Sequence, residues 1–246
     1  MSKCRIRKSP LYWLSAGIIT LTVLGTSAAK AVQIVFDGGS PDLRSANEAS
    51  AWTQANNFWL AAAQTITGVN FWSIETPQGW GGNPNYGWDG NIRYYIFEDA
   101  GGRPSTNPYI QGNATNIVRN ATGRSYVGSS LQLDEYAYSF DFNSPIQIAG
   151  NTTYWLGLHL ASDYNSGYVA DRNNVYWVTT GNNWGGNGME SYNGTFNNWT
   201  DTGTRHAFQL TSRSESVPEP LTILGTIAAV GFGVALRRKY QNHPSN

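Results

Sequence analysis

The stretch YAYSFDF, residues 136–142, decides the fold because aromatic side chains alternate in it with small or charged ones. Successive side chains of an extended strand point to opposite faces, so the four aromatic rings share one face. The stretch IRYYIF, residues 92–97, begins a second strand between an Asp-Gly and a Gly-Gly turn. Both stretches predict strands that bury one face against a hydrophobic core.

Other segments of similar composition are separated by Gly, Asn, Asp and Pro residues that favour turns. The predicted strands are 33–36, 57–62, 66–74, 153–160, 175–179 and 205–211. Residues 47–54 could form a short helix, and a loop is the alternative. Many short strands joined by turns predict an all-β domain with a β-sandwich or jelly-roll architecture.

The net charge of zero for the 246 residues hides an acidic body between basic ends. Residues 32–217 hold eight Arg, no Lys and fifteen Asp or Glu, a formal charge of −7. A surface of that charge repels a phosphate backbone, so we do not expect a nucleic-acid partner. The same residues include nine Trp, twelve Tyr and eight Phe, which are enough large rings to fill a core.

The first 31 residues have the three parts of a signal peptide. A basic start is followed by the apolar run LYWLSAGIITLTVL at 11–24, and Ala29 and Ala31 are small residues at the two positions that signal peptidase reads. An uncleaved anchor helix is the alternative. The only cysteine, Cys4, lies in this segment, so we expect neither a disulfide nor a cysteine-bound metal in the mature chain.

Residues 221–236, LTILGTIAAVGFGVAL, predict a transmembrane helix. A helix of this length spans about 24 Å. Snorkelling of the basic residues that follow makes up the difference from a hydrocarbon core of about 30 Å. The positive-inside rule places Arg237, Arg238 and Lys239 in the cytoplasm and the body outside, in agreement with an N-terminal export signal.

The order of features at this end of the chain is distinctive. Pro218, Glu219 and Pro220 precede the apolar run and the basic cluster follows it, and residues 216–240 together resemble the PEP-CTERM sorting signal. The resemblance implies recognition by an exosortase, removal of the helix, and release to the surface or extracellular matrix of a Gram-negative bacterium that makes exopolysaccharide. A plain anchor that is never cut is the alternative. The tail at 241–246 departs from the pattern, because such signals usually end soon after the basic residues.

The body, residues 32–215, resembles a recurring extracellular domain that precedes PEP-CTERM tags. The resemblance rests on an early FDGG, on ITGVNFW at 66–72, and on the strand at 93–97 that is followed by EDAGG. It also rests on IAGNTTYWLGL at 148–158 and on a closing RHAFQL strand. Such domains are taken as β-sandwiches without an assigned reaction, so the resemblance bears on fold and location.

Motifs of hydrolases, zinc proteases, nucleotide-binding loops and dinucleotide-binding folds are absent from the sequence. His159, Ser162 and Asp163 have the residue types of a catalytic triad, but triads assemble across a fold rather than within five positions. The pairs Glu98-Asp99 and Asp134-Glu135 have the residue types of a glycosidase. Calcium at the turn 89–91, or at Asp163, Asn165 and Asp171, is a further alternative. We predict no catalytic site, no metal site and no cofactor.

The tetrapeptide Trp-Gly-Gly-Asn occurs twice, at 80–83 and 184–187, and each copy is followed by another tryptophan. Aromatic faces suit the C–H face of a pyranose, and amides suit its hydroxyls. The candidate glycan-binding residues are therefore Trp80, Trp88, Trp184 and Trp199. The alternative is that these rings cap the core, since large aromatic side chains are mostly buried.

Together these features predict a non-catalytic protein of the cell surface or extracellular matrix. It would be exported and cleaved by signal peptidase. Its C-terminal helix would anchor the precursor in the membrane until an exosortase processes it. Extracellular polysaccharide is the expected partner, and a carbohydrate-binding module with a defined glycan is the alternative. A secreted hydrolase is the third hypothesis, which two acids facing each other across a cleft would favour.

Overall fold

A computed structural model describes residues 31–77, 87–127, 132–162, 174–182, 186–192 and 194–213. These residues belong to one compact unit, Lys30–Val217. The predicted transmembrane helix, the sorting residues Pro218, Glu219, Pro220, Arg237, Arg238 and Lys239, and all of the signal peptide except Ala31 lie outside the described residues. The described part of the chain contains strands, turns and bends but no helix, which confirms the all-β prediction.

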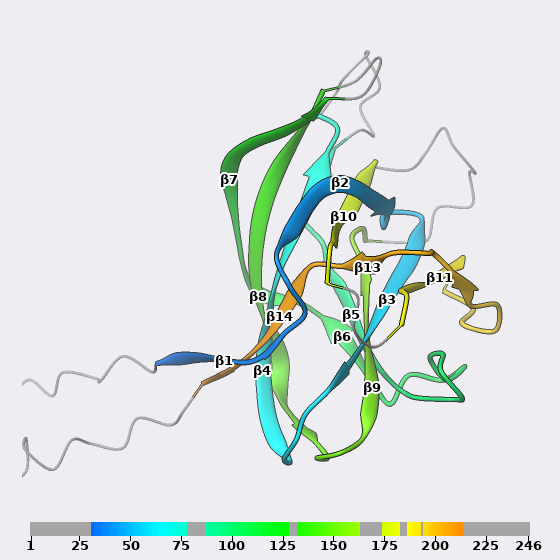
Figure 1. The fold of residues 1–246 in the computed structure, drawn as a ribbon. Coiled ribbons are helices and arrows are strands. Elements are labelled where there is room, and N and C mark those ends of the chain that lie inside the picture. The colour runs from blue at the N-terminus through cyan, green and yellow to red at the C-terminus, as the bar shows by residue number, and fades with distance from the viewer. Residues whose placement is uncertain are drawn as a thin grey trace, which may run out of the picture. The chain divides into compact units, whose positions relative to one another are not determined.

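Two antiparallel sheets form the domain (Figure 1). Within the described residues the larger sheet has eight strands: β1 Val32–Asp37, β2 Pro41–Glu48, β4 Gln64–Glu75, β7 Thr115–Val127, β8 Gln132–Ile148, β10 Val175–Thr180, β13 Arg205–His206 and β14 Phe208–Arg213. The smaller sheet has six: β3 Trp52–Trp59, β5 Arg93–Glu98, β6 Ile110–Asn113, β9 Thr153–His159, β11 Met189–Tyr192 and β12 Thr200–Asp201.

Strand β4 organises the eight-stranded sheet. One edge of it pairs with β8 from Gln64 to Glu75, and β8 pairs in turn with the outer strand β7. The other edge of β4 pairs first with β14 and then with β10, and these two strands carry β1 and β2. The ends of the domain meet in this sheet, because Val32 is the register partner of Arg213.

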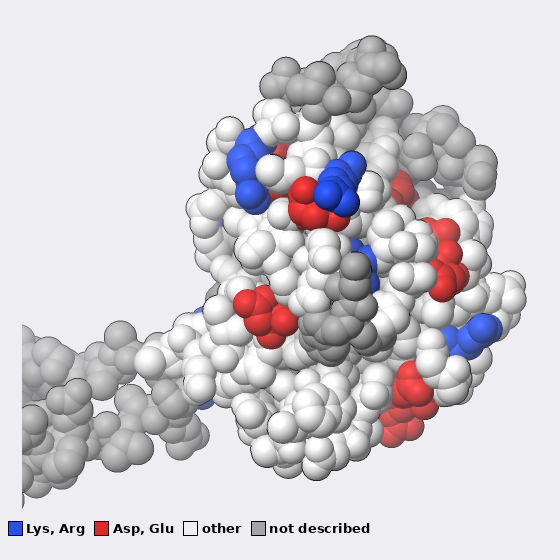
Figure 2. Space-filling model, viewed as in Figure 1, with Lys and Arg blue, Asp and Glu red and all other residues white. Residues whose placement is uncertain are grey.

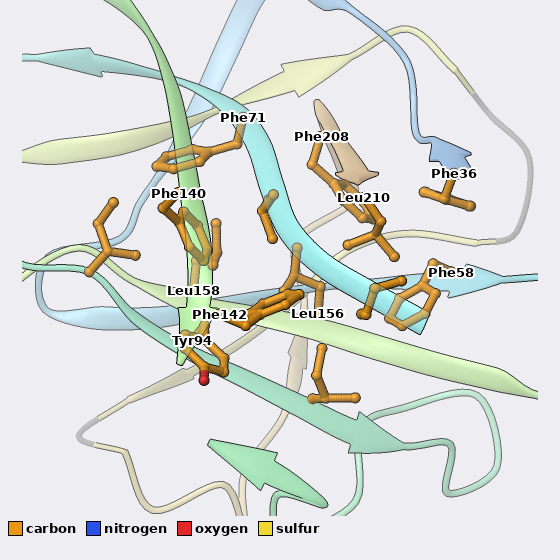
Figure 3. Packing of buried hydrophobic residues seen from close by; sticks show 14 of the residues in the cluster. Phe36, Phe58, Phe71, Tyr94, Phe140, Phe142, Leu156, Leu158, Phe208 and Leu210 are labelled. Atoms are coloured by element: carbon orange, nitrogen blue, oxygen red, sulfur yellow. The ribbon is translucent and has the colours of Figure 1, made fainter. Parts of the chain in front are cut away.

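The core lies between the two sheets, where the labelled rings and leucines of Figure 3 point toward one another. Phe36 of β1 meets Phe58 of β3 at a ring-centroid distance of 5.9 Å, and Phe142 of β8 meets Tyr94 of β5 at 4.7 Å. Each pair joins one sheet to the other. Burial of a side chain of this size contributes about 1.5–3 kcal/mol, so packing between the sheets stabilises the fold without a disulfide.

A second cluster of buried rings covers the opposite face of the six-stranded sheet. Tyr95 and Phe97 alternate along β5 with core residues and so point away from the main core. Phe196 and Trp199, which lie between β11 and β12, pack on Phe97 at 5.0 and 5.2 Å. A loop between two short strands therefore shields an apolar patch that would otherwise face solvent.

The predicted pattern at 136–142 is confirmed. Tyr138, Phe140 and Phe142 are buried in the core, and Tyr136 packs against it. Residues 47–54 do not form a helix: they hold the end of β2, a bend and the start of β3. The bend is fixed by the Glu48 carboxylate, which accepts hydrogen bonds from the backbone N–H groups of Ser50 and Ala51.

Candidate functional site

Two of the four candidate tryptophans, Trp88 and Trp199, lie in the described residues, whereas Trp80 and Trp184 lie outside them. Trp199 is only 8% exposed, and its ring stacks on Phe196 at 5.7 Å and meets Phe97 edge-on. Its Nε1 donates to the Ser105 carbonyl at 3.4 Å. The Trp199 ring is therefore held by a stacked ring, an edge-on ring and a hydrogen bond at its polar tip, and it belongs to the second cluster.

The flanks of the two Trp-Gly-Gly-Asn segments lie at opposite ends of β10. Before the first segment, the Thr76 N–H donates to the Asn174 carbonyl beside the start of the strand. Before the second, the Asn182 N–H donates to Thr180 Oγ1 at its end. Six residue steps, from Asn174 to Thr180, separate these points by about 20 Å. The structure does not bring the described flanks of the two segments together.

A groove follows β4 and β8 on the face of the eight-stranded sheet that points away from the core, and we call it the outer-face groove. On this face Asn70 and Trp72 of β4 oppose Ser139 and Ala137 of β8. The groove is flanked by β7 on one side and by β14 and β1 on the other. It consists of three neighbouring open hollows, one of about 640 Å³ near Thr65 and two of about 270 and 240 Å³ that follow toward Trp72, and adjacent hollows share lining residues.

Hydroxyl and amide side chains dominate the outer-face groove. Six of them are Thr65, Thr67, Asn70, Asn116, Asn120 and Gln147. Several hold one another in place. Asn70 Nδ2 donates to Gln209 Oε1 at 3.2 Å, and Gln147 Nε2 donates to Thr65 Oγ1 at 2.7 Å. A side-chain amide has two donors and two acceptor sites, so each amide held in this way keeps hydrogen-bonding capacity for a ligand.

The charges in the outer-face groove cancel. Arg213 Nη2 lies 2.8 Å from Asp141 Oδ1, and Asn116 Nδ2 donates to the other carboxylate oxygen at 2.8 Å. The Arg213 side chain is 43% exposed, so the pair adds about 0–1 kcal/mol to stability and chiefly fixes geometry. Figure 2 shows charged residues as separate small groups on a largely uncharged surface. The surface seen there offers no extended field for a highly charged partner.

A second hollow lies on the core-facing side of the same sheet, and we call it the Trp88 pocket. It has a volume of about 340 Å³ and is lined by Glu75, Thr76, Pro77, Gly87, Trp88, Arg119, Asp134 and Tyr136. Trp88 is half-buried. It meets Tyr138 edge-to-face at 5.0 Å, and its Nε1 donates to the Asn91 carbonyl at 2.8 Å.

A buried acid forms one wall of the Trp88 pocket. Glu75 is 2% exposed and accepts hydrogen bonds from Arg119 Nη2 and Ser73 Oγ, both at 2.7 Å, and from the Tyr138 hydroxyl. Burial and the Glu75 charge raise the pKa of Tyr138, so the phenol stays protonated and donates. Burial alone would lower the pKa of Arg119, but its hydrogen bond to Glu75 and the Glu75 charge outweigh that effect and raise it.

The described members of the acid pairs and of the triad have different surroundings. Asp134 and Glu135 are successive residues of β8 and point to opposite faces of the sheet. Asp99 accepts a hydrogen bond from Trp155 Nε1 at 2.8 Å, whereas Glu98 is exposed. His159 is buried, with Nδ1 3.2 Å from the Trp52 carbonyl. Asp163 lies outside the described residues.

Asp89, the acid of one suggested calcium turn, is engaged in hydrogen bonds. Its Oδ1 accepts from the Asn91 N–H at 2.9 Å, and its Oδ2 accepts from the Ser162 N–H at 2.8 Å. In the part of the chain that the structure describes, no three His, Cys, Asp or Glu side chains group as metal ligands would. Asp163, Asn165 and Asp171, the other suggested calcium ligands, lie outside that part.

The residues of the outer-face groove were not among the sequence-based candidates. A usable signal was the two-residue period of the strand at 66–74. If Val69 and Phe71 face the core, then Asn70 and Trp72 must face outward. Only the arrangement of neighbouring strands shows that these outward-facing residues line a hollow rather than a flat surface. The Asp141–Arg213 pair, which joins β8 to β14, carries no local sequence signal.

No protein-family model matches the chain, and no curated protein matches it. Among the described residues, no helix has the length and apolar character needed to cross a membrane.

Proposed function

We propose that this chain is an exported, non-catalytic protein of the cell surface or extracellular matrix that holds a polysaccharide chain in its outer-face groove. The observation that carries the proposal is the groove itself, with hydroxyl and amide side chains along its length and Trp72 at one end. From Thr65 to Trp72 it extends about 23 Å at the rise of a strand, long enough for several sugar units.

The chemistry of the outer-face groove matches a polyhydroxylated ligand. Sugar hydroxyls both donate and accept hydrogen bonds, and so do Asn70, Asn120 and Gln147. The half-buried ring of Trp72 offers an apolar surface to the C–H face of a sugar. Because neighbouring side chains already hold several of these groups, a ligand would lose less side-chain entropy on binding.

The domain begins and ends at positions that fit the predicted export and sorting signals. The first strand begins at Val32, directly after the predicted cleavage site at Ala31, and the last strand ends at Arg213, before Pro218. Removal of residues 1–31 would therefore leave β1 intact. Signal peptidase and an exosortase would be the processing partners, and the helix at 221–236 would anchor the precursor in the membrane of a Gram-negative bacterium.

Expression of the full chain in an exopolysaccharide-producing bacterium with an exosortase would test the proposal. We expect the protein in the surface or matrix fraction, retained on polysaccharide isolated from the same cells. Recovery of the protein only from the cytoplasm would contradict the export part. Recovery at the surface without retention would contradict the polysaccharide part.

A further inference from the structure

We propose that the Trp88 pocket binds a single uncharged sugar residue, at a site separate from the outer-face groove. The pocket lies on the core-facing side of the eight-stranded sheet, whereas the groove lies on its other face. Its volume of about 340 Å³ suits one small ligand rather than a chain. The inference concerns different residues from those that carry the polysaccharide proposal and does not depend on them.

Thr76 contributes a buried hydroxyl group to the pocket lining. It is 2% exposed and lines the pocket, and its Oγ1 has no hydrogen-bond partner. A buried hydroxyl without a partner costs about 1–3 kcal/mol, so such groups are rare unless a ligand or water completes them. Its backbone N–H is already used by the Asn174 carbonyl, so the hydroxyl is the part of Thr76 left for a ligand.

Arg119 and Asp134 provide a donor and an acceptor on the same pocket wall. Arg119 directs Nε and Nη2 at Glu75, and among the described residues its Nη1 makes no hydrogen bond. Asp134 accepts a hydrogen bond from Ser125 Oγ on Oδ1 at 2.8 Å, and its Oδ2 makes none with the described residues. A guanidinium N–H, a carboxylate oxygen and a hydroxyl together match the mixed donors and acceptors of adjacent sugar hydroxyls.

Aromatic rings provide the apolar part of the site. Trp88 and Tyr136 both line the pocket. The Arg119 guanidinium lies 3.4 Å from the centre of the Tyr136 ring and covers one face of it, so Trp88 is the ring better placed to meet a ligand. The edge-to-face contact with Tyr138 and the bond from Nε1 to the Asn91 carbonyl fix the orientation of Trp88.

The charges of the pocket disfavour an anion, because Glu75, Asp134 and Arg119 sum to −1. The Arg119–Glu75 bridge pairs two of these charges before any ligand arrives and leaves Asp134 as an acceptor for ligand hydroxyls. A neutral polyol gains hydrogen bonds and ring contact without displacing this bridge. A free monosaccharide and the end of a polysaccharide chain share this chemistry.

The test uses the full-length chain purified in detergent and ligand-observed saturation-transfer NMR with glucose, galactose, mannose and rhamnose as probes. We expect at least one of the four to bind. Thr76→Val keeps the shape of the side chain and removes the orphan hydroxyl. It should weaken that sugar about tenfold, the effect of losing one buried hydrogen bond, while the denaturant midpoint stays unchanged or rises. Thr152→Val, at an exposed turn that lines neither the Trp88 pocket nor the outer-face groove, is the matched control and should bind the sugar as the native chain does.

Two results would overturn the inference: no binding of any of the four sugars, or equal affinity in Thr76→Val, Thr152→Val and the native chain. Oligosaccharides of the bound sugar distinguish a free monosaccharide from the end of a polysaccharide chain as the natural ligand. Weakening of their binding by Thr76→Val identifies a chain end, and binding of the monosaccharide alone identifies a free sugar. Trp72→Ala should leave sugar binding in the Trp88 pocket unchanged even if it abolishes polysaccharide retention in the outer-face groove. The two proposals can therefore fail separately.

Discussion

Asp134 and Glu135 are neighbours in β8, yet their side chains lie on opposite faces of the eight-stranded sheet. Asp134 lines the Trp88 pocket, whereas Glu135 is fully buried on the other face, where it accepts hydrogen bonds from Arg124 and from the Tyr126 hydroxyl. Burial and the Glu135 charge raise the pKa of Tyr126, so its hydroxyl remains a donor. One strand thus supplies a ligand-facing acid and a structural acid from adjacent residues.

The mature N-terminus should be Val32. This residue begins β1 and pairs with Arg213, so cleavage after Ala31 would leave the sheet complete. Mass spectrometry of the N-terminal peptide from exported protein measures this directly. An Ala31→Arg variant, which places a large charged residue at the cleavage site, should keep the whole N-terminal segment. A mature native chain that still carries Cys4 would refute signal-peptide removal.

Release from the membrane should depend on the sorting tripeptide. Replacing Pro218, Glu219 and Pro220 by alanines removes the residues that resemble the exosortase recognition motif but leaves the apolar run and Arg237 to Lys239 in place. We expect the variant to remain uncut in the membrane fraction, which immunoblotting of fractionated cells would show. Equal release of the variant and the native chain would favour a plain anchor instead.

Truncation of Trp199 should destabilise the fold. The ring is 8% exposed and fills the second cluster between Phe97 and Phe196, so Trp199→Ala should lower the free energy of unfolding by about 3–5 kcal/mol. Trp59 is 46% exposed on the same sheet and supplies the matched control, for which we expect a change within about 0.5 kcal/mol. Urea denaturation of both variants checks this. Similar midpoints would show that Trp199 is not a core residue.

The fold should lose stability in mild acid because of His206. Burial, aided by the charge of Arg205, lowers the pKa of His206 to about 3, from 6.5 in an unfolded chain. The ring stacks on Trp177 at 4.6 Å, with Nδ1 2.7 Å from Asn56 Oδ1 and Nε2 3.1 Å from Asn47 Oδ1. In the unfolded chain His206 becomes protonated below pH 6.5, whereas in the folded chain it stays neutral down to about pH 3. Stability is therefore full above pH 6.5 and falls between these values.

At pH 4.5 the loss due to His206 should be about 2–3 kcal/mol relative to pH 7. His206→Gln, which cannot titrate, should lack this component. Urea unfolding of both proteins at the two pH values gives the difference. A gain of stability in acid for the native chain relative to the variant would contradict this prediction. It would show that Asn56 Oδ1 and Asn47 Oδ1 both accept hydrogen bonds from a protonated His206.

The strands with one apolar face could be predicted from the sequence. In the strand at 136–142 the two-residue period coincides with burial, because only one side of the eight-stranded sheet meets the core. The long strand β7 was missed. It lies at the outer edge of its sheet and is mostly exposed, so no apolar alternation marks it, and it is interrupted by two register shifts. An edge strand of this kind is defined by its partner β8 rather than by its own composition.

The candidate site was harder to predict for a related reason. Tryptophan beside glycine and asparagine pointed to Trp199, whose burial depends on a loop that folds over Phe97. The outer-face groove is formed by residues from β4, β7, β8 and β14, which are distant in the chain. No local pattern in any one of these strands encodes the hollow. Of the two candidate tryptophans that the structure describes, Trp88 lies at the wall of a pocket and Trp199 does not.

The most direct test of the account is affinity electrophoresis of the full-length chain in gels that contain soluble exopolysaccharide from the producing bacterium. Polysaccharide should slow the native chain and the Trp59→Ala control equally. It should slow Trp72→Ala and Asn70→Ala much less, because these variants lose an apolar contact or an amide in the outer-face groove but keep the fold. Equal retardation of all four proteins, or of none, would contradict polysaccharide binding in the outer-face groove.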